Sequence, residues 1–175
     1  DPIGSRGLGD VYKRQSIAVK AAATSEGISG KVGKSLSVWT KNCTVIFVGI
    51  GKKEKLTHKI ARDTGAKILS GLSKDLGSEI VVRFTSGWSP ENMTAFAEGM
   101  MLRDYVFDKY QKTDDEEKHN GWKLECQAHE RHLDYLTNSL NSASLVVTGV
   151  HLARDLANEP ANHLYPEEFG RRALD

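Results

Sequence analysis

A run of β-branched and aromatic residues, followed directly by a helical pattern, most constrains how this chain can fold. Residues 44–50, Thr-Val-Ile-Phe-Val-Gly-Ile, form a short continuous apolar run, which is typical of a strand buried on both faces of a parallel sheet. After a turn at residues 51–53, apolar residues recur at four-residue spacing over residues 56–72. This spacing predicts an amphipathic helix. Gly65 lies inside the helix and costs it roughly 1 kcal/mol relative to alanine.

The same order of strand and helix repeats further along the chain. Residues 79–84, Glu-Ile-Val-Val-Arg-Phe, predict a second strand. Ser89 and Pro90 then supply a capping hydroxyl and a favoured first helical residue. The helical pattern that starts there continues to Tyr110.

The last third of the chain predicts a loop, a strand and a long helix. Residues 113–120 are acidic and polar, and residues 122–126 alternate as a strand does. A long helix follows and ends before Glu159, because the residue before Pro160 is pushed out of helical geometry. Alternating strands and helices predict right-handed parallel crossovers and a three-layer α/β/α domain.

The composition is that of a globular chain with balanced charge. The chain is 39% hydrophobic and 27% charged, with 24 basic and 23 acidic residues. This balance gives no electrostatic case for binding nucleic acid or an anionic membrane. No apolar run approaches the roughly 20 residues that cross a bilayer, and no signal peptide is visible. Cys43 and Cys126 lie far apart in apolar runs, which favours reduced, buried thiols and a cytoplasmic protein.

Residues 1–15 are not expected to belong to the natural sequence of the protein. Residues 5–15, Ser-Arg-Gly-Leu-Gly-Asp-Val-Tyr-Lys-Arg-Gln, resemble the translation of a transposase-type sequencing adapter. The alternative is a genuine basic, glycine-rich tail. We expect an artefact and set these residues aside, as any processing scar is set aside. They hold three basic and two acidic residues, so removing them from 24 and 23 leaves 21 of each and no net charge.

Two patterns that could carry chemistry have simpler structural explanations. Gly49-Ile50-Gly51 resembles the start of a dinucleotide-binding loop, but Glu54 stands where the third glycine belongs and would repel a pyrophosphate. We therefore predict a tight strand-to-helix turn at these glycines. Glu125, His129 and His132 could form a metal cluster, but the zinc motif needs histidines four residues apart, with glutamate next to the first. We predict a solvated helix face for this second group.

Residues 147–162, Val-Thr-Gly-Val-His-Leu-Ala-Arg-Asp-Leu-Ala-Asn-Glu-Pro-Ala-Asn, form the most specific motif. The two asparagines and the proline in residues 158–162 can cap helix carbonyls and fix a turn, so a plain helix stop would also explain them. The whole run resembles the hinge of the leucyl aminopeptidase (cytosol aminopeptidase) family. In that family Ala-Arg-Asp-Leu-x-Asn-x-Pro-x-Asn ends the helix that joins an N-terminal α/β domain to the catalytic domain. The run occupies residues 153–162 here.

Earlier segments resemble the same family, in the family's order. Residues 31–34 and 48–53 look like its first-strand region, and residues 97–108 resemble its Glu-Gly-x-x-Leu-x-x-Tyr-x-Phe-Asp block. The resemblance covers about residues 27–175. One departure is Tyr165, which stands before Pro166 where the family usually carries a threonine that can cap the next helix.

The resemblance implies a division of the chain into an N-terminal domain, a hinge and a catalytic start. Residues 16–137 would form an α/β domain similar in fold to macro domains. Residues 138–160 would be the linker helix and hinge, and residues 161–175 the truncated start of the catalytic peptidase domain. The residues that would orient the hinge are Arg154, Asp155, Asn158, Pro160 and Asn162. Because the partner domain is missing, we expect residues 153–175 to be mobile.

By the same resemblance, the parent protein is a two-metal aminopeptidase that removes N-terminal residues, leucine preferred, from peptides. In the family two divalent ions, zinc, manganese or magnesium, polarise the scissile carbonyl and generate the attacking hydroxide. Their ligands lie in the catalytic domain and include an Asn-Thr-Asp-Ala-Glu-Gly-Arg motif, which has no match here. We therefore assign no catalytic and no metal-binding residue, and we expect this fragment to bind no metal and to be inactive. The parent is expected to be a cytoplasmic homo-hexamer.

Two other classes of function stay open. A free-standing macro-like domain would bind ADP-ribose or a nucleotide, and its candidate phosphate loops are Gly49–Gly51 and Ser86–Gly87. Similarity of fold alone does not carry that function. A DNA-binding regulatory module is the other alternative, since some bacterial relatives bind DNA through this part. The neutral charge argues against nucleic acid as a partner.

Overall fold

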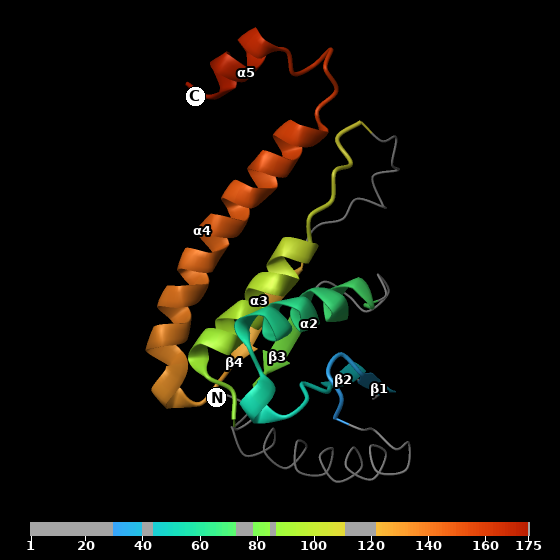
Figure 1. The fold of residues 1–175 in the computed structure, drawn as a ribbon, viewed down its shortest axis with the longest axis vertical. Coiled ribbons are helices and arrows are strands. Elements are labelled where there is room, and N and C mark those ends of the chain that lie inside the picture. The colour runs from blue at the N-terminus through green and yellow to red at the C-terminus, as the bar shows by residue number, and fades with distance from the viewer. Residues whose placement is uncertain (1–29, 40–43, 73–78, 85–86, 111–121, 175) are drawn as a thin grey trace, which may run out of the picture. The chain divides into compact units, whose positions relative to one another are not determined.

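A computed structural model describes residues 30–39, 44–72, 79–84, 87–110 and 122–174 of the chain. The chain divides into two compact units, Asp1–Leu56 and Thr57–Asp175. The described part of the first unit holds strands β1 (Ser35–Trp39) and β2 (Thr44–Val48) and the 3-10 helix η1 (Lys53–Lys55). The second unit holds, in chain order, α2 (His58–Ser70), β3 (Glu79–Arg83), α3 (Pro90–Arg103), β4 (Lys123–Gln127), the 3-10 helix η4 (Glu130–His132), α4 (Leu133–Asn158) and α5 (Pro166–Arg172) (Figure 1).

The first unit is built on an antiparallel pair of strands. Ser35 of β1 lies opposite Val48 of β2, and Trp39 lies opposite Thr44. The predicted strand over residues 44–50 is present as β2, but its observed partner is antiparallel rather than parallel. All five residues of β2 are partly buried. A β-branched run fits any partly buried pleated surface, so it does not encode the direction of its neighbour.

Gly49 and Gly51 are needed because the backbone comes close to itself. A Cβ atom on Gly49 would lie 2.4 Å from the carbonyl oxygen of Lys31, and Gly51 has a φ of 76°, which favours glycine. The Gly49 N–H donates to the Lys34 carbonyl, and the Gly51 N–H donates to the Gly30 carbonyl, each at 2.8 Å. These contacts support the predicted tight turn.

Side-chain hydroxyls cap α2 and α3, and α3 begins at Ser89 and Pro90 as the sequence predicts. The Thr57 hydroxyl accepts a hydrogen bond from the Ile60 N–H at 3.3 Å and caps α2. The Ser89 hydroxyl accepts one from the Asn92 N–H at 3.3 Å and caps α3, whose first residue is Pro90. α3 ends at Arg103, so the prediction that the helix continues to Tyr110 is wrong. Residues 104–110 instead leave the helix and contact the end of α4.

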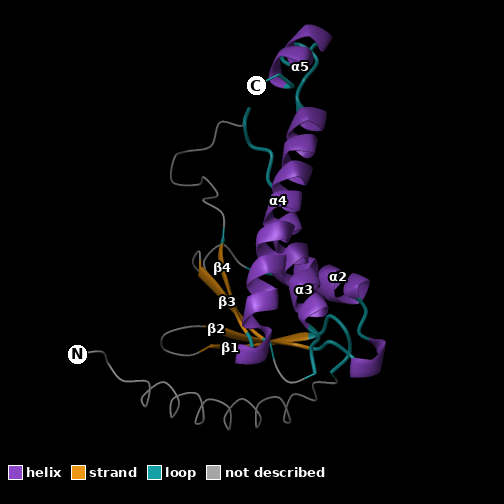
Figure 2. Cartoon of the chain, turned by 90° about the vertical axis from the view of Figure 1, so that its left-hand side faces the viewer, coloured by secondary structure: helices purple, strands orange, loops and turns teal. Residues whose placement is uncertain are grey.

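The core of the second unit is formed largely by α3 with its neighbours α2 and α4, which pack along it (Figure 2). Phe84, Trp88 and Phe96 meet edge to face, with ring centroids 5.0–5.9 Å apart. The buried apolar residues are Ala61, Leu69, Phe84, Met93, Ala95, Phe96, Ala97, Met100, Leu136 and Val147. The buried Thr64 hydroxyl donates to the Ile60 carbonyl at 2.6 Å, so its polar group is satisfied.

β3 and β4 pair in parallel, from Glu79 opposite Lys123 to Arg83 opposite Gln127. With α3 between them in the sequence, they form the parallel strand–helix–strand unit that the alternating pattern predicts. In the described part of the chain each of the two sheets has two strands. The fold is therefore mixed α/β, while the three-layer arrangement and the likeness to macro domains stay predictions. The predicted loop over residues 113–120, and Cys43, lie outside the described residues.

α4 runs for 26 residues, roughly 39 Å at 1.5 Å per residue. It ends at Asn158, and Glu159 is extended, with φ −65° and ψ 131°, as expected of a residue before proline.

α5 starts at Pro166 although Tyr165 makes no side-chain cap, and Glu167 and Glu168 occupy its first turn. Negative charges in the first turn stabilise a helix, because they interact favourably with the positive end of its dipole. None of the helices that the structure describes is long and apolar enough to cross a membrane.

Candidate functional site

The hinge residues predicted on α4 meet the segment that follows α3, and Tyr105 is the centre of that contact. The Tyr105 hydroxyl donates to the Asp155 carboxylate at 2.9 Å. It also accepts from the side-chain amide of Asn158 at 3.0 Å. Burial of the phenol and the neighbouring carboxylate raise the pKa of Tyr105. The hydroxyl therefore stays protonated and keeps its role as a donor.

Arg154 makes a second connection from α4 to the end of α3. Its Nη1 donates to the carbonyl oxygen of Leu102 at 2.8 Å, one of the last carbonyls of α3 that lack a helical partner. The Arg154 guanidinium also lies 5.4 Å from the centroid of the Tyr105 ring. The His151 ring lies on the same tyrosine, with centroids 5.2 Å apart. Successive turns of α4 thus hold the chain that leaves α3.

Pro160 and Asn162 lie in the turn between α4 and α5. The Pro160 carbonyl accepts hydrogen bonds from the N–H groups of His163 and Leu164, at 2.8 and 2.9 Å. Asn162 is exposed in this turn. The structure therefore brings Arg154, Asp155 and Asn158 together through Tyr105, and it leaves Asn162 apart from them.

Glu159 is a hub that the sequence analysis did not single out. Its side chain is only 2% exposed. Lys109 and Tyr110 donate to its carboxylate, and Nη1 of Arg172 lies 3.1 Å from the carboxylate oxygen Oε1. These donors, Lys109 first and Tyr110 next, lower the pKa of Glu159 to about 2. Its position inside the Asn-Glu-Pro-Ala-Asn run was the available sequence signal.

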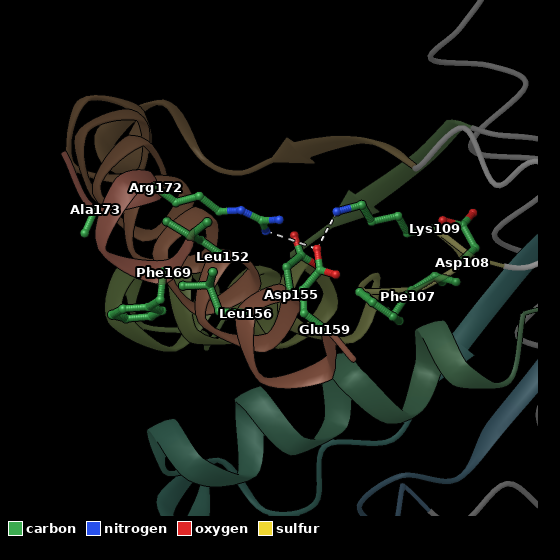
Figure 3. A pocket seen from close by; sticks show the side chains of 11 residues that line it. Phe107, Asp108, Lys109, Leu152, Asp155, Leu156, Glu159, Phe169, Arg172 and Ala173 are labelled. Carbon is green, nitrogen blue, oxygen red and sulfur yellow. Dashed lines mark hydrogen bonds and ion pairs between the residues drawn. The ribbon is translucent and has the colours of Figure 1, made fainter. Parts of the chain in front are cut away.

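A groove of about 560 Å³ lies beside this hub, where Lys109 and Arg172 reach the carboxylate from two sides (Figure 3). Its lining combines charged residues with the apolar residues Val106, Phe107, Leu152, Leu156, Phe169 and Ala173. Its charged residues are Asp108, Lys109, Asp155, Glu159 and Arg172. Among the described residues that line the groove there is no serine, cysteine or histidine, and Lys109 and Arg172 both bind Glu159. Through these two bonds Glu159 links the segment after α3 to α5.

The other sequence candidates do not form a reactive centre. Glu125 lies in β4, and His129 precedes η4, where its Nδ1 accepts the Arg131 N–H at 3.4 Å. The predicted solvated helix face is therefore wrong, because Glu125 lies in a strand and His129 caps η4. Burial, with the charge of Glu125, raises the pKa of the Cys126 thiol to about 11. Among the described residues, no group of three or more histidine, cysteine, aspartate or glutamate side chains could hold a metal ion.

Comparison with known proteins identifies the family. A sequence model of the cytosol aminopeptidase family, N-terminal domain, matches residues 10–114. The chain belongs to the cytosol aminopeptidase family. This confirms the resemblance carried by the hinge run and the earlier segments. The match includes residues 10–15, which the sequence analysis set aside.

Members of the cytosol aminopeptidase family align with most of this chain. A probable cytosol aminopeptidase of Rhodopseudomonas palustris (strain BisA53) is 33% identical over 162 residues, which are 89% of this chain and 32% of the relative. A probable cytosol aminopeptidase of Nitrobacter winogradskyi is 30% identical over 174 residues, 96% of this chain and 35% of the relative. The chain thus spans about a third of the length of these relatives.

Solved structures share the fold. A tomato leucine aminopeptidase mutant superposes with a TM-score of 0.72 at 22% identity, over 94% of this chain and 33% of that one. The bottromycin maturation enzyme BotP gives a TM-score of 0.70 at 21% identity, over 88% and 33%. At these identities the likeness is one of fold.

Proposed function

We propose that this chain is the N-terminal part of a metalloaminopeptidase, a cytoplasmic hydrolase that removes N-terminal residues, leucine preferred, from peptides. One observation carries the proposal. The sequence model of the family's N-terminal domain matches residues 10–114. The chain covers only 32% of the length of a relative described as a probable cytosol aminopeptidase. These two facts support the proposal that the chemistry belongs to sequence that those relatives have beyond the aligned region.

The residues described here do not fit a metal site, since no suitable group of ligands is found among them. In the proposal the two divalent ions, zinc, manganese or magnesium, bind in the peptidase part of the parent. There they supply Lewis-acid activation of the substrate carbonyl and of water. A structure of the similar enzyme BotP is described as a complex with Mn, which supports manganese as one of the ions to test.

The contribution of this chain is to hold and direct the connection to the peptidase part. In the proposal residues 138–160 are the linker helix and hinge, and residues 161–175 begin the catalytic domain. Arg154, Asp155 and Asn158 support that role, because they bind the chain leaving α3 through Tyr105 and Leu102. The proposal also includes a homo-hexameric parent, on the family resemblance alone.

The test is to read the source gene on both sides of this segment and to assay its product. We expect a reading frame that continues into a domain with aspartate, glutamate and lysine metal ligands. We expect its purified product to hydrolyse leucyl-p-nitroanilide after loading with Mn²⁺ or Zn²⁺ and to lose the activity with a chelator. A full-length product that has no metal-dependent hydrolysis would overturn the proposal.

The 175-residue chain serves as the matched control in the same assay. We expect no turnover of leucyl-p-nitroanilide with either metal, because the chain contains none of the family's ligand motif. Turnover by this chain above a buffer blank would show that catalytic residues lie within it. That result would contradict the assignment of catalysis to the rest of the parent.

A further inference from the structure

α5 is a short helix with little apolar surface to hold it in place. It has seven residues, fewer than an isolated helix needs to be stable in water. Phe169 is 50% exposed, and Leu174, just beyond the helix, is 90% exposed. Because apolar burial is this limited, the position of α5 depends strongly on its polar contacts.

Arg172 provides the polar link from α5 to the end of α4. Its Nη1 lies 3.1 Å from Oε1 of Glu159. Its Nε lies 2.8 Å from Oε1 of Glu168 within the same helix. The Arg172 side chain is 30% exposed, so the guanidinium is partly withdrawn from water. Of these two pairs, only the bond to Glu159 connects α5 to another segment.

Glu159 is also bound from the opposite side by the segment that follows α3. Lys109 and Tyr110 both donate to its carboxylate, and the Tyr110 ring lies 4.9 Å from the ring of His163 in the turn before α5. Three segments therefore meet at one carboxylate with a side chain only 2% exposed. A buried charge with several partners is costly to leave unpaired, so loss of the carboxylate affects all three.

We propose that Glu159 is a latch that holds α5 in place as one wall of the groove. With the carboxylate in place, the turn over residues 160–165 is closed and α5 is docked. Without it, the chain from residue 161 onward swings away, while α4 stays helical up to Asn158. The consequence for the direction of the peptidase part rests on the proposed function, whereas the latch itself concerns only this chain.

Hydrogen exchange followed by mass spectrometry tests the latch on the 175-residue chain at neutral pH. The variant is Glu159→Gln, which keeps the shape of the side chain and removes its charge. The matched control is Glu167→Gln, because Glu167 is an exposed acid in the first turn of α5. We expect Glu159→Gln to speed exchange about tenfold in residues 163–174, with residues 140–152 of α4 unchanged. We expect the control to have a smaller effect.

Two results of this comparison would overturn the latch. One is exchange in residues 163–174 that is the same in Glu159→Gln as in the unmodified chain. The other is an equal acceleration in the Glu167→Gln control, since the effect would then reflect the loss of any negative charge near α5 rather than of the carboxylate that its partners bind. Neither result depends on peptidase activity, so failure of the latch is distinguishable from failure of the proposed function.

Glu159→Gln could also loosen α4, so two variants of Arg172 test the latch from the side of α5. They are Arg172→Met and Arg172→Lys. Arg172→Met removes the α5 side of the latch and leaves Lys109 and Tyr110 on Glu159. We expect it to release residues 163–174 alone, and we expect Arg172→Lys, which keeps the positive charge, to restore part of the protection. Full protection of residues 163–174 in Arg172→Met would overturn the proposal.

Discussion

Gly65 of α2 and Gly99 of α3 occupy reciprocal positions where the two helices meet. A Cβ atom on Gly65 would lie 2.1 Å from the carbonyl oxygen of Phe96 on α3. A Cβ atom on Gly99 would lie 2.0 Å from the carbonyl oxygen of Arg62 on α2. Each glycine therefore lets the other helix approach to backbone contact. The cost of Gly65 to helix α2, noted from the sequence, is offset by this packing.

We expect alanine at either glycine to destabilise the chain. The added methyl group would meet backbone, which cannot rotate away, and overpacking of this kind costs about 1–3 kcal/mol. Urea unfolding of Gly65→Ala and Gly99→Ala measures the loss. Gly149→Ala in α4 is the control, because its Cβ would have no neighbour within 4 Å. We expect that variant to gain roughly 0.5–1 kcal/mol from helix propensity. Equal or higher stability in Gly65→Ala would contradict the close approach.

We expect Tyr105→Phe to loosen the hinge without unfolding α3. The substitution removes the hydroxyl that joins Asp155 and Asn158 and leaves the ring beside Arg154 and His151. Hydrogen exchange should rise roughly two- to tenfold in residues 104–110 and in the last turn of α4. Tyr135→Phe, at an exposed position of α4, is the control and should change nothing in residues 104–110. Unchanged exchange in both variants would show that the hydroxyl does not hold the hinge.

We expect the docking of α5 to weaken in acid rather than near neutrality. Hydrogen bonds from Lys109 and Tyr110 lower the pKa of Glu159 to about 2, and bonds from Arg171 and Arg172 lower the pKa of Glu168 to about 2. A carboxyl whose pKa is lower in the folded state stabilises it fully above its ordinary pKa of 4.5. That stabilisation is lost as pH falls from 4.5 through 2. The carboxyl ¹³C shift of Glu159, followed by NMR, should titrate with a midpoint near 2. A midpoint near 4.5 would contradict the hydrogen bonds to this carboxylate.

We expect Cys126 to react slowly with alkylating reagents in the folded chain. Burial raises the pKa of its thiol to about 11, and only the thiolate is nucleophilic. Iodoacetamide labelling at pH 8, with the site identified by peptide mass spectrometry, should be much slower in the native chain than in urea. Because the thiol is favoured in the fold, the stability that it contributes is present below pH 9 and lost as pH rises through 11. Equal labelling rates in buffer and urea would contradict the burial.

The starts and stops of elements could be predicted because their signals are local. Ser89 and Pro90 begin α3, and Pro160 stops α4, as the sequence predicts. A capping hydroxyl or a proline ring acts within one turn, so its effect does not depend on distant packing. The strands predicted at residues 79–84 and 122–126 are present as β3 and β4, because residue type and alternation are likewise read within a single segment.

Elements that depend on distant partners could not be predicted in the same way. The helical pattern continues past Arg103, but α3 ends there. Tyr105 binds Asp155 of α4, and Lys109 binds Glu159 just beyond α4, each 50 positions away in the sequence. The antiparallel direction of β1 and β2 was also missed, since an apolar run does not specify its partner. Glu159 was taken only as the residue before a proline, because none of its three partners is a sequence neighbour.

By itself the sequence determined the family, through the hinge run and the earlier segments, together with the order and the capped ends of the elements. Only the tertiary structure decided which residues the hinge run contacts, where α3 stops and why Gly65 is a glycine. The physical reason is the distance along the chain over which each interaction acts. Caps, turns and periodicity act between neighbours, whereas a buried carboxylate or a helix crossing gains its energy from groups that only folding brings together.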